Sequence, residues 1–294
     1  MKKNFLTILL RIRNENLFLE SFIKHYFAEG VDEIYILDDN STQPFPKIVE
    51  DERVFIYEAT TFKSHHEKLY DSQMLYNHLL RDKTEWFMFV DADEFITTRR
   101  NPNKTIREEL ETTFKDADLI KIPWIMFGSN GQDKNPKQVL TDTIWRWNHD
   151  KPHPHPEEAM KIWPHRKCKL DKIEVKSIFK TEAFAKLTTH CPSNPTREIN
   201  IVDGVDNIQN YMNEPETEIW YHNLREDCID RAYLTCNHYR NISKEQMRQK
   251  ADDSHLPLYR VENCYELQLQ SDFSEKKDEF LKNKAIGRKY YENN

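Results

Sequence analysis

The amino-acid sequence predicts an α/β protein with a mostly parallel central sheet flanked by helices and a helical C-terminal extension. In the N-terminal half, short runs of branched and aromatic residues alternate with segments whose apolar residues recur at helical spacing. Repeated strand–helix–strand order favours a parallel sheet with helices on both faces. The 294 residues, of which 38% are hydrophobic and 12% aromatic, are sufficient for a large buried core.

The apolar pattern also gives the order of the elements. It predicts strands at residues 5–12, 33–37, 53–57 and 86–90, with helices at 17–29 and 66–81. The first helix is expected to end at Gly30, a typical residue just past a helix C-terminus. The second half is predicted to contain strands at 118–124, 143–147 and 172–179, a turn at 127–131, a proline-broken loop at 151–165, and helices at 227–236, 243–252 and over the last forty residues.

Composition excludes several classes of function. The 43 lysine and arginine residues against 50 aspartate and glutamate residues give a net charge of −7, which argues against general nucleic-acid binding. The chain has 5 glycines, and they form neither G-x-G-x-x-G nor G-x-x-x-x-G-K-[ST]. A bound phosphate must therefore be held by a metal, by side chains or by a helix N-terminus.

Cysteine usage and hydropathy bear on location. The 5 cysteines contain no C-x-x-C pair, so neither a zinc finger nor a disulfide scaffold is indicated, and a reducing compartment fits best. No apolar run approaches the roughly 20 residues that span a bilayer. The apolar start of the chain is followed at once by Arg11 and Arg13, so we expect a buried strand there and a cytoplasmic location.

Three polar clusters follow three predicted strands, at residues 11–15, 38–42 and 91–94. Ligands of parallel α/β sheets bind beyond the carboxyl ends of the strands, so we expect these clusters to converge. Asp91 and Asp93 stand at i and i+2 directly after the apolar run WFMFV. Two carboxylates in this arrangement can reach one Mg²⁺ or Mn²⁺, whose other ligands would be water and substrate phosphate.

Six segments, in order over residues 6–250, carry a resemblance to a known group of enzymes. They are LLRIRNEN, YILDDNST, QMLYNHLLRDKTEWFMFVDADEF, IPWIMFGSNG, EVKSIFK and NHYRNISKEQMRQK. Together they resemble glycosyltransferases of families 2 and 92, which have the GT-A fold. The resemblance implies a GT-A domain over residues 1–240, with a nucleotide-sugar and metal half at 1–100 and an acceptor half at 101–240, followed by a helical extension at 241–294.

The resemblance also implies roles for particular residues. It places the donor nucleotide and its diphosphate against Arg13, Asn14, Glu15, Asp38, Asp39, Gln73, Asn77 and Lys176. It assigns Mn²⁺ or Mg²⁺ to Asp91 and Asp93, with His238 completing the metal or diphosphate site. The sequence departs from the family pattern at Gln43 and Gln132, which weakens the inference about the substrate.

The function expected from the resemblance is metal-dependent transfer of a sugar from a nucleotide-diphosphate donor, UDP-linked, to a hydroxyl of a glycan or polysaccharide precursor, with inversion. A carboxylate would act as general base, for which Asp142 is the first candidate and Asp133 the second. Three alternatives remain: a sugar nucleotidyltransferase, a phosphatase with an aspartyl nucleophile, and a non-catalytic carbohydrate-binding protein on the same fold. The sugar, the acceptor and the oligomeric state are left open.

Overall fold

The structure is a computed structural model that describes residues 4–59, 65–152, 154, 173–212, 219–253 and 264–288. The described helical segments are α1 (Asn16–Ala28), η1 (Lys47–Glu50), α2 (His65–Leu75), the π-helical η2 (Tyr76–Leu80), α3 (Ile106–Glu111), α4 (Val139–Asp142), η4 (Thr181–Ala183), α6 (Glu226–Ile229), α7 (Lys244–Asp253), α8 (Cys264–Gln270) and α9 (Phe280–Gly287). Among them, none is long and apolar enough to cross a membrane.

The strands are shorter elements that fall mostly in one large sheet. They are β1 (Asn4–Ile12), β2 (Glu33–Asp38), β3 (Val54–Glu58), β4 (Thr84–Phe89), β5 (Glu94–Thr98), β6 (Leu119–Met126), β7 (Trp145–Arg146), β8 (Ile173–Lys180), β9 (Phe184–Lys186), β10 (Ser193–Pro195), β11 (Ile199–Asp203), β12 (Gln209–Met212), β13 (Trp220–Tyr221), β14 (Leu234–His238) and β15 (Lys276–Lys277).

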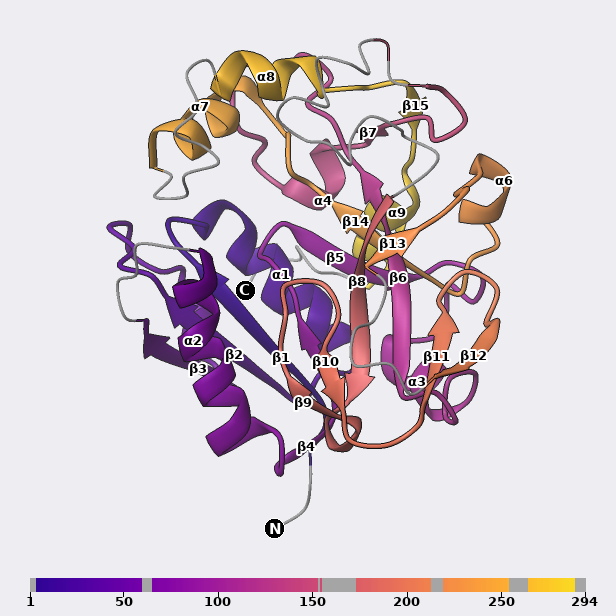
Figure 1. The fold of residues 1–294 in the computed structure, drawn as a ribbon. Helices are drawn as coiled ribbons and strands as arrows, with labels where there is room; N and C mark the ends of the chain where they lie inside the picture. The colour runs from indigo at the N-terminus through magenta and orange to yellow at the C-terminus, as the bar shows by residue number, and fades with distance from the viewer. Residues whose placement is uncertain are drawn as a thin grey trace.

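The central sheet has the strand order β12-β11-β6-β8-β4-β1-β2-β3. β1 pairs in parallel with β2 on one side and with β4 on the other, and β2 pairs in parallel with β3. β8 runs antiparallel between β4 and β6, so those two strands point the same way. The predicted α/β class with a central sheet flanked by helices is confirmed, and β8 is the antiparallel member at its centre (Figure 1).

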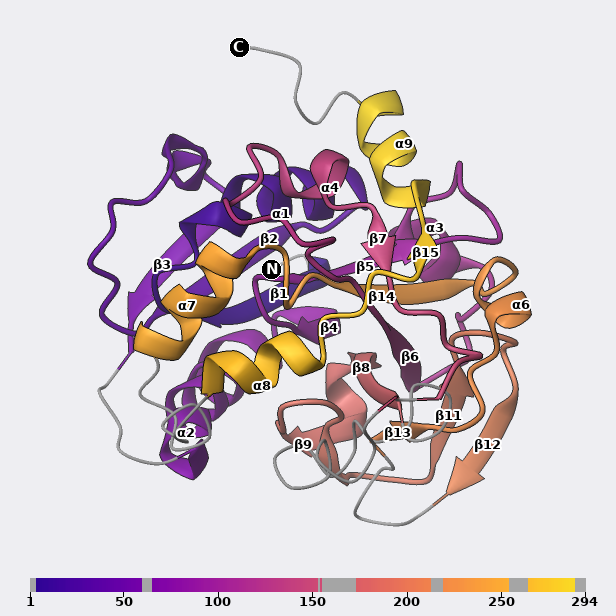
Figure 2. The same cartoon turned by 90° about the horizontal axis from the view of Figure 1, so that it is seen from above.

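The two faces of the sheet bury separate clusters of apolar side chains. Leu6, Ile8 and Leu10 of β1 pack with α1 in the larger cluster, while Leu9 packs with η2 in the other. This alternation follows from the period of two along a strand. Helices therefore cover both faces, and Figure 2 shows α1 and α2 on opposite sides of the strands.

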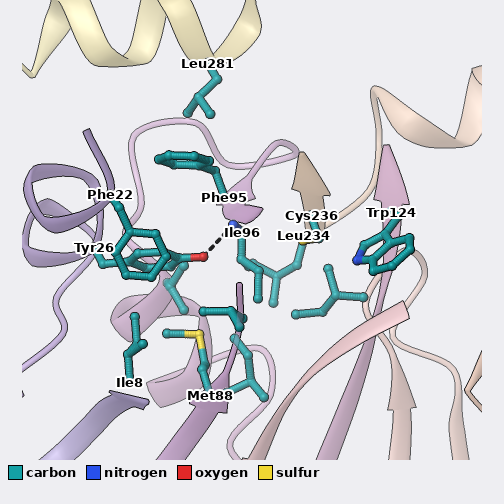
Figure 3. Packing of buried hydrophobic residues seen from close by; sticks show 14 of the residues in the cluster. Ile8, Phe22, Tyr26, Met88, Phe95, Ile96, Trp124, Leu234, Cys236 and Leu281 are labelled. Atoms are coloured by element: carbon teal, nitrogen blue, oxygen red, sulfur yellow. Dashed lines mark hydrogen bonds between the residues drawn. The ribbon is translucent and has the colours of Figure 1, made fainter. Parts of the chain in front are cut away.

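β5 and β14 extend the central sheet away from its main row of strands. β14 pairs antiparallel with β5 and parallel with β6, so it holds the segment after β4 against the rest of the sheet. The hydroxyl of Tyr26 accepts a hydrogen bond of 3.0 Å from the amide of Ile96 (Figure 3). The same hydroxyl donates one of 2.9 Å to the carbonyl of Glu94. α1 is thereby tied to β5, the strand that begins where the acidic cluster ends.

Buried charged groups attach β15 and α9, near the end of the chain, to the rest of the described structure. α9 places Lys284 within 2.7 Å of the buried carboxylate of Glu29. β15 pairs with β7, next to Arg146, whose guanidinium forms two hydrogen bonds with Glu226 and one with Asp278. The division into a domain at 1–240 and an extension at 241–294 stays a prediction.

Some predicted elements differ from the structure. The helix predicted at 227–236 is wrong: the chain makes the short helix α6 and then the buried strand β14. The strand predicted at 143–147 is reduced to the two residues of β7, which pair with β15. β5, β9 to β13 and β15 were not predicted, and β15 interrupts the helix predicted over the last forty residues, between α8 and α9. The loop predicted at 151–165 lies almost entirely outside the described residues.

The Arg146 network gives a prediction about stability. Replacing Arg146 with Met removes a partner from each of the buried carboxylates of Glu226 and Asp278, and breaking such a buried pair costs about 3–5 kcal/mol. Urea unfolding of the Arg146→Met protein should show a loss of this size. Lys24→Met, which removes an i,i+4 ion pair with the exposed Glu20, should cost less than about 1 kcal/mol. Equal losses of unfolding free energy in the two variants would show that the buried ion pairs of Arg146 contribute no more than an exposed pair.

Candidate active site

The three polar clusters meet at one edge of the sheet because the strands before them run in parallel. The amide of Asp39, after β2, donates to the carbonyl of Ile12 at the end of β1. On the other side of β1, the amide of Val90, after β4, donates to the carbonyl of Leu9. The predicted convergence of the clusters is therefore confirmed. α7 and α8 lie over this edge in both views (Figures 1 and 2).

The first two clusters hold one another in shape. Arg11 forms an ion pair with Asp39 at 3.0 Å, and the guanidinium of Arg13 donates to the carbonyl of Asp39. Asn14 has a φ of +54°, and its side-chain oxygen accepts a 2.8 Å hydrogen bond from the amide of Thr42. The carboxylate of Asp38 accepts from the amide of Ser41. These residues build the rim, and their roles toward a donor nucleotide stay predictions.

Asp91 lies at the open side of the third cluster. Its side chain is 54% exposed, and one carboxylate oxygen lies 3.1 Å from the ammonium of Lys176 on β8. The same ammonium lies 3.2 Å from the buried carboxylate of Glu94 and donates to the carbonyl of Thr189. Burial opposes the charge of Lys176, but Asp91 and Glu94 outweigh it and raise the pKa of this lysine. Lys176 is therefore a permanent cation beneath Asp91.

Asp93 is buried and held from two other elements. Its Oδ2 lies 2.6 Å from Nζ of Lys250 on α7, and its Oδ1 lies 3.5 Å from Nε2 of His238 on β14. Burial opposes ionisation of Asp93, but Lys250 and then His238 outweigh it and hold the pKa of this carboxyl well below its usual range. Burial lowers the pKa of His238, so its imidazole is neutral at neutral pH.

Glu15 is the residue directly before α1, and its carboxyl group is close enough to Asp91 and Asp93 to feel their charges. Burial raises the pKa of Glu15 from 4.5 to about 7; the charge of Lys250 opposes this shift, and the charges of Asp93 and Asp91 add to it. Glu15 is thus a carboxyl group that gains and loses its proton near neutral pH. Such a value is typical of groups that exchange protons in active sites, although ion-pair networks also produce it.

An aromatic wall on the β6 side was not assigned from the sequence. The ring of Trp124 lies 4.3 Å from that of His238 and 5.3 Å from that of His190. Among the described residues, the indole nitrogen of Trp124 and Nδ1 of His238 are buried with no hydrogen-bond partner. Trp124 is 6% exposed and belongs to the larger apolar cluster, so this wall is the part of the core that faces the site.

Four candidate residues lie apart from the Asp91–Asp93 pair. Gln73 donates to Asn77 and accepts from the amide of Leu187, so it fastens α2 to the β9–β10 hairpin. Asp133 is 76% exposed and pairs with Lys244. Asp142 ends α4, where it accepts from the amide of Gln138 and the hydroxyl of Thr141. In the described parts of the chain, none of the four forms a hydrogen bond or ion pair with Asp91 or Asp93.

The residues present fit a divalent cation only in part. Across the described residues, no set of three or more His, Cys, Asp or Glu side chains is arranged to hold a metal ion. Asp91 and Asp93, two positions apart in the sequence, nevertheless supply two carboxylates with hard oxygen ligands, and Asp91 is open to solvent. Mg²⁺ is usually held in this way, by one or two carboxylates with water and phosphate completing its shell. The donor set therefore fits a cation that shares its ligands with a phosphate.

Residues 14–256 match Glycosyltransferase family 92. The chain belongs to this family, so the predicted resemblance to family 92 is confirmed. No curated protein matches the sequence.

Solved structures that resemble the chain are remote in sequence. One is glucosyl-3-phosphoglycerate synthase from Mycobacterium tuberculosis, in complex with Mn²⁺, UDP and glucosyl-3-phosphoglycerate, at 14% identity and a TM-score of 0.34. That match covers 63% of this chain and 59% of the synthase. Another is the mannosyltransferase PcManGT from Pyrobaculum calidifontis in complex with GDP-Man and Mn²⁺, at 16% identity, covering 42% of this chain and 36% of that one, with a TM-score of 0.29.

The raised pKa of Glu15 predicts a pH dependence of stability. Between 4.5 and about 7 the folded protein binds more protons at Glu15 than the unfolded chain does, so stability falls as pH rises through this window. The Glu15→Gln protein cannot lose this proton and should show a smaller fall. Urea midpoints of metal-free protein measured across this window test it.

Glu20→Gln, which changes an exposed glutamate on the same helix, is the matched control and should follow the wild-type curve. If the Glu15→Gln and wild-type curves stay parallel over the whole window, Glu15 does not carry the raised pKa.

Proposed function

We propose that this protein is a metal-dependent glycosyltransferase that moves a sugar from a nucleotide-diphosphate donor, UDP-linked, to a hydroxyl group of a glycan or polysaccharide precursor, with inversion at the anomeric carbon. The observation that carries the proposal is the pair Asp91 and Asp93 at the edge where β1, β2 and β4 end, with Asp93 ionised and Asp91 open to solvent. The chain's membership of family 92 supports the transfer of a sugar.

In this proposal Asp91 and Asp93 hold Mn²⁺ or Mg²⁺, with His238 beside them. When bound, the cation would stabilise the charge that develops on the leaving nucleotide diphosphate. Lys176 keeps Asp91 in position from below and adds a positive charge to the site. The rim of Arg13, Asn14, Glu15, Asp38 and Asp39 would then face the nucleotide.

The direction of the strands supports an acceptor on the β6 side. β6 and β4 are both antiparallel to β8, so the carboxyl end of β6 lies at the same edge of the sheet as Asp91. The segment that leaves β6 contains Asp133 and Asp142. Transfer by a single displacement needs a base that takes the proton of the acceptor hydroxyl, and we propose Asp142 for it.

The test is release of nucleotide from a panel of nucleotide-diphosphate sugars with Mn²⁺, with and without acceptor sugars. UDP-sugars should be consumed, and consumption should stop with EDTA and return with Mn²⁺.

Calorimetry should show that UDP binds far more tightly with Mn²⁺ than without it, because the chain has no glycine-rich loop to hold the phosphates. Equal UDP affinity in both conditions would overturn the metal-dependent reading.

The two aspartates should differ in what their loss does to the fold. Asp91→Asn and Asp93→Asn should each lower transfer by about 100-fold or more, as losing a charged partner of the reacting group does. Asp91 is half exposed, so Asp91→Asn should keep the wild-type stability. Asp93 is buried between Lys250 and His238, and its loss should cost about 1–3 kcal/mol of metal-free stability. Wild-type turnover in both variants would show that these carboxylates do not serve the reaction.

The base is tested separately. Asp142→Asn should leave UDP binding in the presence of Mn²⁺ nearly unchanged and lower transfer by about 10²–10⁴-fold, the usual contribution of a general base. Asp133→Asn, in the same connection between β6 and β7, is the comparison. Normal transfer by the Asp142→Asn protein would remove Asp142 from the mechanism, and a loss confined to Asp133→Asn would move the role to that residue.

A further inference from the structure

Lys250, the last residue of the segment NHYRNISKEQMRQK, makes a contact with the acidic pair that was not predicted from the sequence. It stands in the last turns of α7, 157 residues after Asp93, and its Nζ lies 2.6 Å from the buried Oδ2 of that carboxylate. The ammonium lies 5.6 Å from the centre of the Phe18 ring, and the side-chain oxygen of Gln246 accepts from it at 3.0 Å when that amide is turned to satisfy both of its groups. The C-terminal segment thus places a cation on one of the two carboxylates proposed to hold the metal.

A divalent ion and Lys250 compete for the same oxygen. Mg²⁺ binds a carboxylate oxygen at about 2.0–2.1 Å, so an ion on Oδ2 would lie within about 5 Å of Nζ as placed here. Repulsion between a +2 and a +1 charge at that distance is strong in a site as dry as the one around Asp93. The other oxygen of Asp93 faces His238, so neither oxygen is open to an ion without a rearrangement.

The two lysines of the site differ in how readily they can leave. Lys176 is 1% exposed and is bound by Asp91, Glu94 and the carbonyl of Thr189. Lys250 is 19% exposed, and its flexible four-carbon stem reaches Asp93 from α7. Lys250 is therefore the cation that can withdraw, while Lys176 stays.

We propose that Lys250 is an exchangeable counterion, which pairs with Asp93 in the metal-free protein and is displaced when a divalent cation binds. The proposal rests on the metal site proposed above. Without metal, Lys250 stabilises an ionised carboxylate that would otherwise be buried and unpaired. The same contact weakens binding of the metal alone, because the ion must first replace the lysine.

The experiment measures Mn²⁺ affinity, by the electron paramagnetic resonance signal of free Mn²⁺, for the full chain and its Lys250→Met variant. We expect Lys250→Met to tighten Mn²⁺ binding by about tenfold or more, since a competing charge is removed, while its metal-free melting temperature falls. Lys276→Met is the matched control, because Lys276 also lies 2.6 Å from a carboxylate, that of Glu226, away from the site. It should leave Mn²⁺ affinity unchanged. Unchanged or weaker Mn²⁺ binding by Lys250→Met would overturn the proposal.

A second measurement on the wild-type chain does not depend on the variant's folding. Reductive methylation followed by peptide mass spectrometry reports how accessible each lysine amine is. Saturating Mg²⁺ should increase the labelling rate of Lys250 and leave that of Lys276 unchanged, and an unchanged rate at Lys250 would overturn the exchange.

The metal site itself is checked with Asp91→Asn. If the wild-type protein does not bind Mn²⁺, or if the Asp91→Asn protein binds it equally well, the proposed metal site and the exchange both fail. If that binding is present and Lys250 does not respond to it, the exchange alone fails.

Discussion

The burial of Asp93 and Glu94 at the end of β4 is the constraint on which the rest of this site depends. A carboxylate removed from water needs a cation or hydrogen-bond donors close by, or it gains a proton. Asp93 is buried but receives the ammonium of Lys250 from α7, which keeps the pKa of this carboxyl well below the usual range. Glu94 lies beside the ammonium of Lys176 from β8, but its burial outweighs this charge and raises its pKa well above the usual range. Two elements far along the chain are thereby drawn to the edge where β1, β2 and β4 end. The antiparallel insertion of β8 beside β4 brings Lys176 to that edge, and α7 lies over it to bring Lys250.

The sequence correctly predicted the elements whose apolar pattern is typical of only one kind of secondary structure. β1, β2, β3 and β4 are short apolar runs bounded by polar residues, and each was predicted to within about three residues of its observed ends, the usual uncertainty of a boundary. β14 was not predicted, because LTCNH mixes apolar and polar residues that are all buried between β5 and β6. A strand covered on all sides shows no alternation, and the residues before it suggested a helix. The pairings that bury it join segments more than a hundred residues apart.

The candidate site divides in the same way. Clusters that directly follow strands were found, because a parallel sheet brings its carboxyl ends together whatever the details of packing. Lys250 was missed because a lysine in a charged helical segment is typical of a solvated face, and its partner is 157 residues away. Trp124 does lie in the core, as a tryptophan in an apolar strand usually does, but its contact with the ring of His238 could not be predicted from the sequence. Both residues acquire their place from tertiary packing, which local pattern does not describe.

The scarcity of glycine explains why charge has so large a part at this edge. Among the described residues, every non-glycine residue with a positive φ is an asparagine, and Asn14 and Asn40 are the two that shape the rim beside the acidic pair. Asparagine tolerates the left-handed conformation and bonds its neighbours, as Asn14 does with the amide of Thr42. It keeps a Cβ, however, so the backbone cannot approach a phosphate as closely as a glycine loop can. A site built from asparagine turns must therefore bind an anion through side chains or a cation. That requirement is met by two carboxylates: Asp91 lies over Lys176, which stays, and Asp93 lies against Lys250, which can leave.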